Sequence, residues 1–370
     1  MTSLAVPTAV LTRAQGDADA FAALTGVHVD AAECVAGRAA LLGLPAPHRI
    51  SAGGATRLMR GRDAWCALTL SRPDDIAAVP ALLQRHSVGA DPWPDIERWV
   101  AAHDAAEVTA RARLLGLPVA ALGETPAAPS RRHPHGAGTA PRSPAGLLVA
   151  DLSSMWAGPL CGRLLARAGA TVVKVESPAR PDGTRCGPPA FYDWMNSGKL
   201  SYSADFDGTG IRGLLAAADV VIESSRPAAL ARRGLGPADV APRDGRVWLR
   251  VTGHGTAGDR ANWVAFGDDA AVSGGLVSGD DDAPAFCGDA IADPLTGLRG
   301  AVEVAESLHR GGGELIEVSM AAVAAGYAAL PKQPQTVCTA MPAPPGRAAD
   351  LGADNATVER LVAEKLAATC

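Results

Sequence analysis

The chain has 370 residues, of which 48% are hydrophobic and 20% are charged, and its formal net charge is −5 at pH 7. This composition supports a large buried core, and the acidic balance does not favour nucleic acid, whose phosphates need a clustered positive surface. We find no apolar window long enough for a membrane span and no signal peptide, and the seven cysteines are scattered without a C-x-x-C pair. We therefore expect a cytoplasmic protein with reduced thiols, no metal site and neither nucleic acid nor a membrane as partner.

Residues 1–124 are predicted to form a small α+β domain. Apolar spacing and the Gly and Pro residues that end each run predict helices over 18–25, 31–45 and 73–86 and two helices within 91–118. Between them, 55–72 has the pattern of a β-hairpin that turns around Gly61–Asp63, and 119–123 is predicted to be a short strand.

Residues 125–145 are rich in Pro, Gly, Ser, Arg and His and show no apolar periodicity. This composition predicts a linker or a long exposed loop. We interpret His133 and His135 as solvated side chains rather than metal ligands, because no rigid element is expected to hold them.

Residues 146–330 alternate between apolar strand patterns and helix patterns. The predicted strands are GLLVADL, TVVKVE, DVVIES and RVWLRVTG, and the segments between them have the pattern of helices. This alternation predicts an α/β domain with a parallel sheet covered on both faces, followed by a C-terminal segment over 331–370. Ligands of such sheets bind at the carboxyl ends of the strands, where SSMWAGP, ESPARPDGTR, ESSRPAAL and TGHGTAG are expected to meet.

The loop after the first strand lacks the G-x-G-x-x-G phosphate fingerprint, although Gly158-Pro159 suits a helix start and Glu176 ends the second strand as in NAD-binding folds. A dinucleotide site is therefore only weakly indicated. Basic residues are predicted at the same edge and would suit a phosphorylated ligand, although each alone is more often a solvated charge: Lys174, Arg180, Arg185, Lys199, Arg226, Arg232 and Arg233.

The segment CGDAIADPLTG holds Asp289 and Asp293, and Asp293 stands beside Pro294 at a predicted helix start. An Asp in this position is most often an N-cap. The alternative is a nucleophilic carboxylate that attacks a thioester held beside it.

Several ordered segments together resemble the class III coenzyme A transferases. They are VADLSSMWAGPLCGRLLARAGATVVKVESP, GPPAFYDWMNSGKLSYSADF, DVVIESSRPAALARRGLG, VWLRVTGHGTAG, FGDDAAVSGGL and IADPLTGLRGAVEVAESLHRGGGELIEVSM. The resemblance implies a Rossmann-like CoA-binding domain, an interlocked homodimer, acyl-CoA and carboxylic acid substrates, and no tightly bound cofactor. It places the CoA-binding residues at Met155, Trp156, Ala157, Lys199, Ser224, Ser225, Arg226 and Arg232, and we add Arg180 from the basic residues expected at the same edge.

The resemblance also favours Asp293 as the catalytic nucleophile and implies acyl-CoA:carboxylate CoA transfer. Racemase relatives carry a His in a G-H-D triplet, which here is Gly267-Asp268-Asp269, so racemisation is disfavoured. His254, in a turn after the fourth strand, is a weaker candidate for proton transfer. The alternatives are a CoA-ester racemase or dehydratase, or a non-catalytic CoA-binding protein. The family's small domain usually follows the segment EVSMA, whereas here the matching residues precede the sheet, so the order resembles either a permutation or the product of a fused tandem copy.

Overall fold

The computed structural model describes residues 4–338, 340–344 and 346–368, and its centre is a seven-stranded sheet in the order β5-β13-β10-β9-β6-β7-β8. All neighbours are parallel except β5, which pairs antiparallel with β13. The strands are β5 (Arg131–Pro134), β6 (Leu148–Asp151), β7 (Thr171–Glu176), β8 (Leu200–Ser203), β9 (Val220–Glu223), β10 (Val247–Thr252) and β13 (Glu314–Ser319). Counted along the chain, the parallel strands follow the order 3-2-1-4-5-6 of doubly wound dinucleotide-binding sheets.

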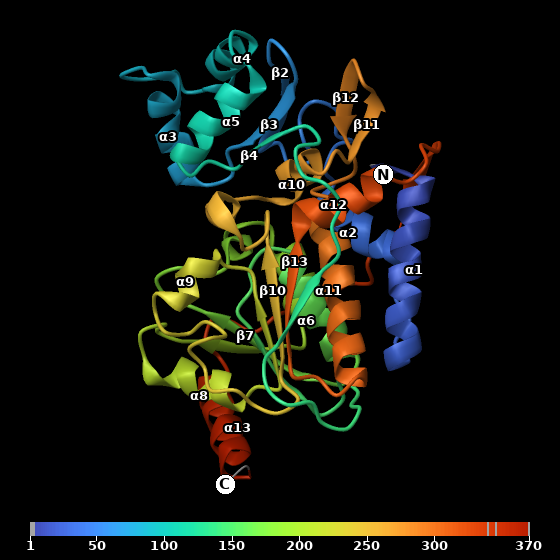
Figure 1. Ribbon diagram of the computed structural model, residues 1–370, viewed down its shortest axis with the longest axis vertical. Coiled ribbons are helices and arrows are strands. Elements are labelled where there is room, and N and C mark those ends of the chain that lie inside the picture. The colour runs from blue at the N-terminus through green and yellow to red at the C-terminus, as the bar shows by residue number, and fades with distance from the viewer. Residues whose placement is uncertain (1–3, 339, 345, 369–370) are drawn as a thin grey trace.

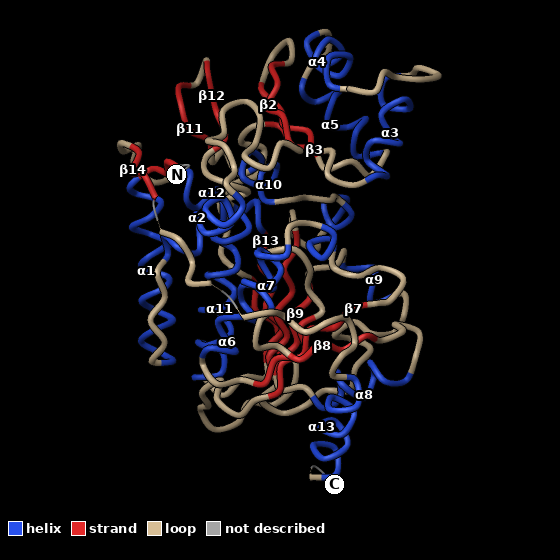
Figure 2. Tube along the Cα trace, turned by 180° about the vertical axis from the view of Figure 1, so that it is seen from behind, coloured by secondary structure: helices blue, strands red, loops and turns tan. Residues whose placement is uncertain are grey.

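Helices cover both faces of this sheet, because its strands are apolar on both sides. One face packs against α1 (Thr8–Thr25), α2 (Ala31–Leu42), α6 (Ala157–Arg167), α7 (Pro189–Asn196), α10 (Gly267–Ser273), α11 (Ala292–His309) and α12 (Met320–Ala328). The other face packs against α8 (Thr209–Ala217), α9 (Pro227–Ala231) and α13 (Asn355–Ala367). Val149 and Ala150 of β6 illustrate the alternation, since each enters a different core. Figure 2 shows α8 and α13 at the end opposite the small domain.

The small domain has its own core. It comprises the three-stranded sheet β2 (Thr56–Arg60), β3 (Trp65–Thr69) and β4 (Val119–Ala121) with α3 (Pro73–Leu83), α4 (Trp93–Ala101) and α5 (Ala105–Leu114). The predicted hairpin and the strand after it are confirmed. In Figure 1 the arrowheads of β10 and β13 point towards this domain, so it lies over the carboxyl edge of the large sheet. The α/β fold with a smaller α+β domain is therefore as predicted.

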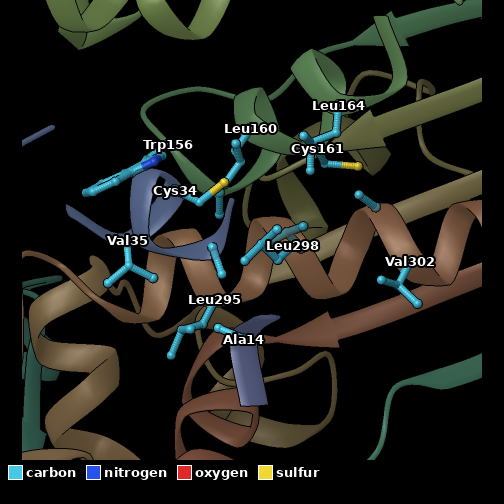
Figure 3. Packing of buried hydrophobic residues seen from close by; sticks show 14 of the residues in the cluster. Ala14, Cys34, Val35, Trp156, Leu160, Cys161, Leu164, Leu295, Leu298 and Val302 are labelled. Atoms are coloured by element: carbon cyan, nitrogen blue, oxygen red, sulfur yellow. The ribbon is translucent and has the colours of Figure 1, made fainter. Parts of the chain in front are cut away.

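The N-terminal helices lie elsewhere than predicted. The division at residue 124 assigned them to the small domain, but α1 and α2 belong to the core of the large sheet, where they pack against α11. Their alanine-rich faces permit this close approach. Figure 3 shows Cys34 and Val35 of α2 in the same apolar layer as Leu160 of α6 and Leu295 of α11.

The segment predicted as a linker also differs, because it contains β5, which forms an edge of the large sheet. Its side chains are exposed, so no apolar periodicity marks it, and its pairing with β13 uses backbone groups. The remaining strands of the described residues form two antiparallel two-stranded sheets. One joins β1 (Leu4–Pro7) with β14 (Gln335–Cys338), and the other joins β11 (Val277–Asp280) with β12 (Ala283–Phe286). Short 3-10 turns occur at Gly183–Cys186 and Gly258–Asn262. Within the described residues, no helix has the length and hydrophobicity to cross a membrane.

Candidate active site

The loops after β6 and β9 meet at the carboxyl edge, where the strand order of the sheet reverses. The Ser154 N–H donates to the Ser224 Oγ at 3.2 Å and joins the two loops. Met155 has a φ of 74°, a left-handed conformation that is uncommon for a residue with a side chain. Its N–H donates to Asp182 at 3.1 Å. A reversal of strand order is where doubly wound sheets bind their ligands.

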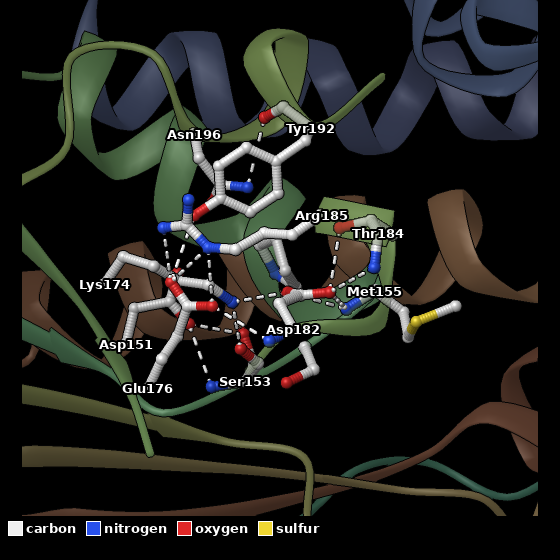
Figure 4. A network of polar contacts seen from close by, with 12 residues as sticks. Asp151, Ser153, Met155, Lys174, Glu176, Asp182, Thr184, Arg185, Tyr192 and Asn196 are labelled. Carbon is white, nitrogen blue, oxygen red and sulfur yellow. Dashed lines mark hydrogen bonds and ion pairs between the residues drawn. The ribbon is translucent and has the colours of Figure 1, made fainter. Parts of the chain in front are cut away.

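A buried polar network holds the Met155 loop in place (Figure 4). Lys174 Nζ lies 2.7 Å from Asp182 Oδ2, and although burial opposes ionisation, Lys174 holds the pKa of Asp182 below its usual value. Glu176 pairs with Arg185 at 2.7 Å and accepts from the Tyr192 hydroxyl at 3.1 Å. Glu176 ends the second strand, as the ribose-binding acid of NAD-binding folds does. Because its carboxylate is occupied by these partners, it is not placed to bind a ribose.

Lys199 is placed inside the protein rather than at the ligand edge. Its Nζ donates to Asp151 Oδ2 and Pro159 O, each at 2.8 Å, and to Asn196 Oδ1 at 3.1 Å. Its side chain is 1% exposed, so the predicted contact with CoA is not available to it. The pair fits because a β-carbon on Gly162 would lie 2.7 Å from Asp151 Oδ2, so glycine supplies the space for the ion pair.

The other predicted CoA-binding residues differ in their exposure and in the surfaces that they line. Ser224, Ser225 and Arg226 line a cavity of about 80 Å³ together with the Thr252–Gly253 turn. Arg180, Arg226 and Arg232 are exposed, whereas Trp156 and Ala157 are buried at the start of α6. The Trp156 ring packs against the Phe191 and Trp194 rings. In this conformation only the backbone of Trp156 is therefore available to a ligand.

Asp293 lies in the first turn of α11 and is only partly exposed. The N-cap of this helix is Ile291, and no side chain caps it, so the capping role that local sequence favours does not occur. The backbone N–H groups of Ala157 and Gly267, at the starts of α6 and α10, favour the charged form of the Asp293 carboxyl and lower its pKa. Ala290, just before the helix, has a φ of 43°, which marks a strained turn.

Two charged residues act on this carboxyl, Arg38 of α2 and Asp268 of α10, and both also act on Asp289. Arg38 Nη1 lies 2.6 Å from Asp289 Oδ1. Burial raises the pKa of Asp293 to about 7, with Arg38 lowering and Asp268 raising it. Burial likewise raises the pKa of Asp289 to about 6 and raises the pKa of Asp268. Raised pKa values in one cluster are typical of functional sites.

Of this cluster, sequence reasoning proposed Asp293 as a nucleophile and did not place Arg38 beside it. The signal available was a lone cation in the apolar helix AAECVAGRAALL. This signal was not informative, because sequence spacing does not show that Arg38 meets Asp289, 251 positions away.

Asp268 and Asp269 attach the small domain to the start of α10. The Thr56 Oγ donates to Asp268 Oδ2 at 3.3 Å and the Thr69 Oγ donates to Asp269 Oδ1 at 2.8 Å. The two threonines are also a cross-strand pair, with hydroxyl oxygens 3.0 Å apart. These contacts give the two aspartates a structural role at the position where racemase relatives carry their G-H-D triplet.

His254 is buried and its ring lies edge-on to Trp263, with centroids 5.3 Å apart. Burial and the nearby Arg113 and Arg260 lower its pKa to about 3, so the ring is neutral at physiological pH. Its contacts therefore favour packing over proton transfer. In the part of the chain that the structure describes, no group of three or more His, Cys, Asp or Glu side chains is arranged to hold a metal ion.

Comparison with known proteins shows the family to which the chain belongs. The profile of CoA-transferase family III matches residues 145–357, more than half of the chain, and the chain belongs to this family. It is 32% identical over 202 residues to a succinate–glutarate CoA-transferase of Agrobacterium fabrum, a match that covers 47% of the chain and 50% of the relative. It is 30% identical over 191 residues to a succinyl-CoA–D-citramalate CoA-transferase of Chloroflexus aurantiacus, covering 46% and 48%.

A CaiB/BaiF family protein from Brucella suis has a solved structure that matches 50% of this chain and 55% of its own, with 30% identity and a TM-score of 0.46. The chain thus spans about half the length of the curated relatives it matches. Arg38, from α2, lies outside the 145–357 match.

Proposed function

We propose that this protein transfers CoA between an acyl-CoA and a carboxylic acid, with Asp293 as the nucleophile. The observation that carries the proposal is the placement of Asp293, a residue of intermediate exposure at the carboxyl edge of the sheet, whose carboxyl is stabilised in its charged form by the N–H groups of Ala157 and Gly267. These donors orient the carboxyl group and can accommodate the charge that develops when it attacks a thioester.

The reaction starts when an Asp293 oxygen attacks the thioester carbon of the donor. The C–S bond breaks, CoA thiolate leaves, and a mixed anhydride between Asp293 and the acyl group forms. The thiolate then attacks the Asp293 Cγ and releases the donor carboxylate, which leaves an aspartyl-CoA thioester. An acceptor carboxylate then attacks the aspartyl-CoA thioester and releases CoA thiolate, which gives a second mixed anhydride. The thiolate attacks the acceptor's acyl carbon in this anhydride, so Asp293 is freed and the acceptor departs as its CoA ester. No net proton or electron is consumed, so no tightly bound cofactor is required.

The CoA site of the proposal lies at the meeting of the β6 and β9 loops. In this site the CoA molecule is contacted by Met155, the Trp156-Ala157 backbone, Ser224, Ser225 and Arg226. The exposed Arg180 and Arg232 bind its phosphates. Guanidinium groups suit this task because they bind phosphate oxygens bidentately. We leave Lys199 out because its ammonium group is enclosed by Asp151, Pro159 and Asn196. A cytoplasmic homodimer is part of the same proposal.

The test is to incubate the full chain with succinyl-CoA and record its intact mass. The expected product is a covalent aspartyl-CoA adduct, which hydroxylamine converts to a hydroxamate that peptide mapping places on Asp293. Asp293→Asn should give no adduct, whereas Asp281→Asn, at a side chain 96% exposed, should behave as the native protein. Undiminished CoA transfer by Asp293→Asn would refute the covalent mechanism.

A further inference from the structure

Arg38 has a place in the site that the mechanism above does not use. It lies on α2, from the N-terminal part of the chain, and its side chain is 23% exposed although Asp289, its partner, is fully buried. The guanidinium carbon lies 5.7 Å from the Trp156 ring centroid and 5.5 Å from that of Phe191. Both aromatic contacts hold a cation in place beside the start of α6.

The backbone of Gly53 lies beside the Arg38 guanidinium. A β-carbon on Gly53 would lie 3.1 Å from Arg38 Nη2, so this glycine leaves room beside the group. Arg38 is therefore fixed by contacts from several elements and still reaches solvent.

The Arg38–Asp289 pair leaves hydrogen-bonding capacity on both partners. A guanidinium carries five N–H donors, and Arg38 uses Nη1 for Asp289 Oδ1. Within the described residues, the second oxygen of Asp289 is buried and has no hydrogen-bond partner. The contact is thus one-sided rather than the closed, bidentate fork that Arg forms when carboxylate binding is its whole role.

The charges around Asp293 make this spare capacity significant. Asp268 and Asp289 are acidic, and the carboxylate that must attack the Asp293 thioester is also an anion. Arg38 is the cation that acts on Asp268, Asp289 and Asp293 alike. An incoming carboxylate needs such a cation to offset repulsion from the two neighbouring acids.

We infer that the edge of the Arg38 guanidinium facing away from Asp289 binds the carboxylate of the acceptor acid and directs it at the Asp293 thioester. This inference rests on the proposed function and makes Arg38 a determinant of the acceptor class. If Arg38 binds the acceptor in this way, it accelerates the reaction of anionic acceptors. It does not accelerate the reaction of a neutral nucleophile.

The experiment compares two nucleophiles on one intermediate. The native chain, Arg38→Met and Arg38→Lys are loaded to completion with succinyl-CoA, freed of small molecules, and mixed with acetate, succinate or hydroxylamine, and decay of the aspartyl-CoA thioester is followed by intact mass. Arg57→Met is the matched control, because Arg57 also pairs with a carboxylate at 2.6 Å, stacks on an indole and is 21% exposed, yet lies in the small domain.

We expect Arg38→Met to slow reaction with the carboxylates about 10- to 100-fold, the effect of one lost charge-assisted hydrogen bond, and to leave hydroxylamine cleavage within about twofold. Arg38→Lys should show the same selective defect to a smaller extent, and Arg57→Met no defect. Equal slowing for all nucleophiles, or no slowing, would overturn the inference. Absence of any thioester in the native chain would instead contradict the proposed function, and the inference with it.

Discussion

Gly267 lies so close to Asp293 that no side chain fits between them: a β-carbon on Gly267 would come within 2.4 Å of Asp293 Oδ2 and 2.2 Å of Ala290 O. The Gly267 N–H also lowers the pKa of the same carboxyl. Close approach of the backbone, rather than an unusual backbone angle, therefore requires glycine here. The start of α10 and the start of α11 thus form one structural unit around the carboxyl.

Replacing Gly267 by Ala should displace Asp293 and lower CoA transfer by at least about 100-fold, because small misplacements of a reacting group are costly. Overpacking should also lower the free energy of unfolding by about 1–3 kcal/mol. Steady-state kinetics and urea unfolding measure the two effects. Gly326→Ala is the matched control, since a β-carbon there meets no atom within 4 Å and should leave both quantities unchanged or improved.

The pH dependence of the reaction should reflect the raised pKa of Asp293, which is about 7. The nucleophile is the carboxylate, so kcat/KM should rise as pH increases from 5.5 to about 8, with an apparent pKa near 7 for the free enzyme. Asp268→Asn removes a negative neighbour and should shift this limb to lower pH. A profile that is flat across this range, or unmoved by Asp268→Asn, would contradict the electrostatic coupling of the two carboxyls.

The sequence was sufficient for the sheet and for choosing Asp293 as the candidate nucleophile, because both depend on local patterns. Alternating apolar strands and helices identified the α/β domain, and Asp293 stood in a recognisable segment at a helix start. Lys199 shows the limit of such inference. Its position in the segment NSGKLS suggested a ligand contact, but whether a lysine faces solvent or a buried carboxylate depends on packing that spacing does not encode.

Arg38 shows the same limit, because it lies at the site although the sequence did not predict it there. Nothing within α2 marks this arginine as part of a site, since an isolated cation on an apolar helix is ordinarily a surface charge. It gains its role because α1 and α2 pack on α11 rather than on the small domain. That packing depends on shape complementarity between alanine-rich helices, which the composition permits but does not specify.

Stability should fall as pH rises through the neutral range, and Asp269 is a principal cause. Burial raises the pKa of this carboxyl from 3.8 to about 8, so the folded chain holds a proton that the unfolded chain releases. The stabilising effect is complete below about pH 4 and is lost as pH approaches 8, with a slope of up to about 1.4 kcal/mol per pH unit per proton.

Asp269→Asn tests this, because the amide keeps the oxygen that accepts from Thr69 and Phe266 but does not titrate. The variant should lose less stability between pH 5 and 8 than the native chain, as measured by urea unfolding at each pH. Asp268, Asp289 and Asp293 also have raised pKa values, so part of the slope should remain. Identical slopes for the native chain and the variant would show that Asp269 does not carry the proton.

The buried pair of Lys199 and Asp151 yields a prediction that separates stability from ligand binding. Lys199→Met leaves Asp151 as an uncompensated buried charge, which should cost about 3–5 kcal/mol of unfolding free energy. Adding Asp151→Asn should recover part of this loss, because the lone charge is then removed. Both variants, where folded, should bind CoA within about twofold of the native affinity, since neither residue contacts the proposed site.

Arg232→Met is the opposite case, because Arg232 is exposed at the end of α9. It should leave the free energy of unfolding within about 0.5 kcal/mol of the native value, and it should weaken CoA binding with a reduced dependence on salt, because a phosphate contact is lost. Urea unfolding and isothermal titration calorimetry at two ionic strengths measure both quantities for all variants. If Lys199→Met instead weakened CoA binding while keeping native stability, Lys199 would belong to the ligand site, and its ion pair with Asp151 would have to open when CoA binds.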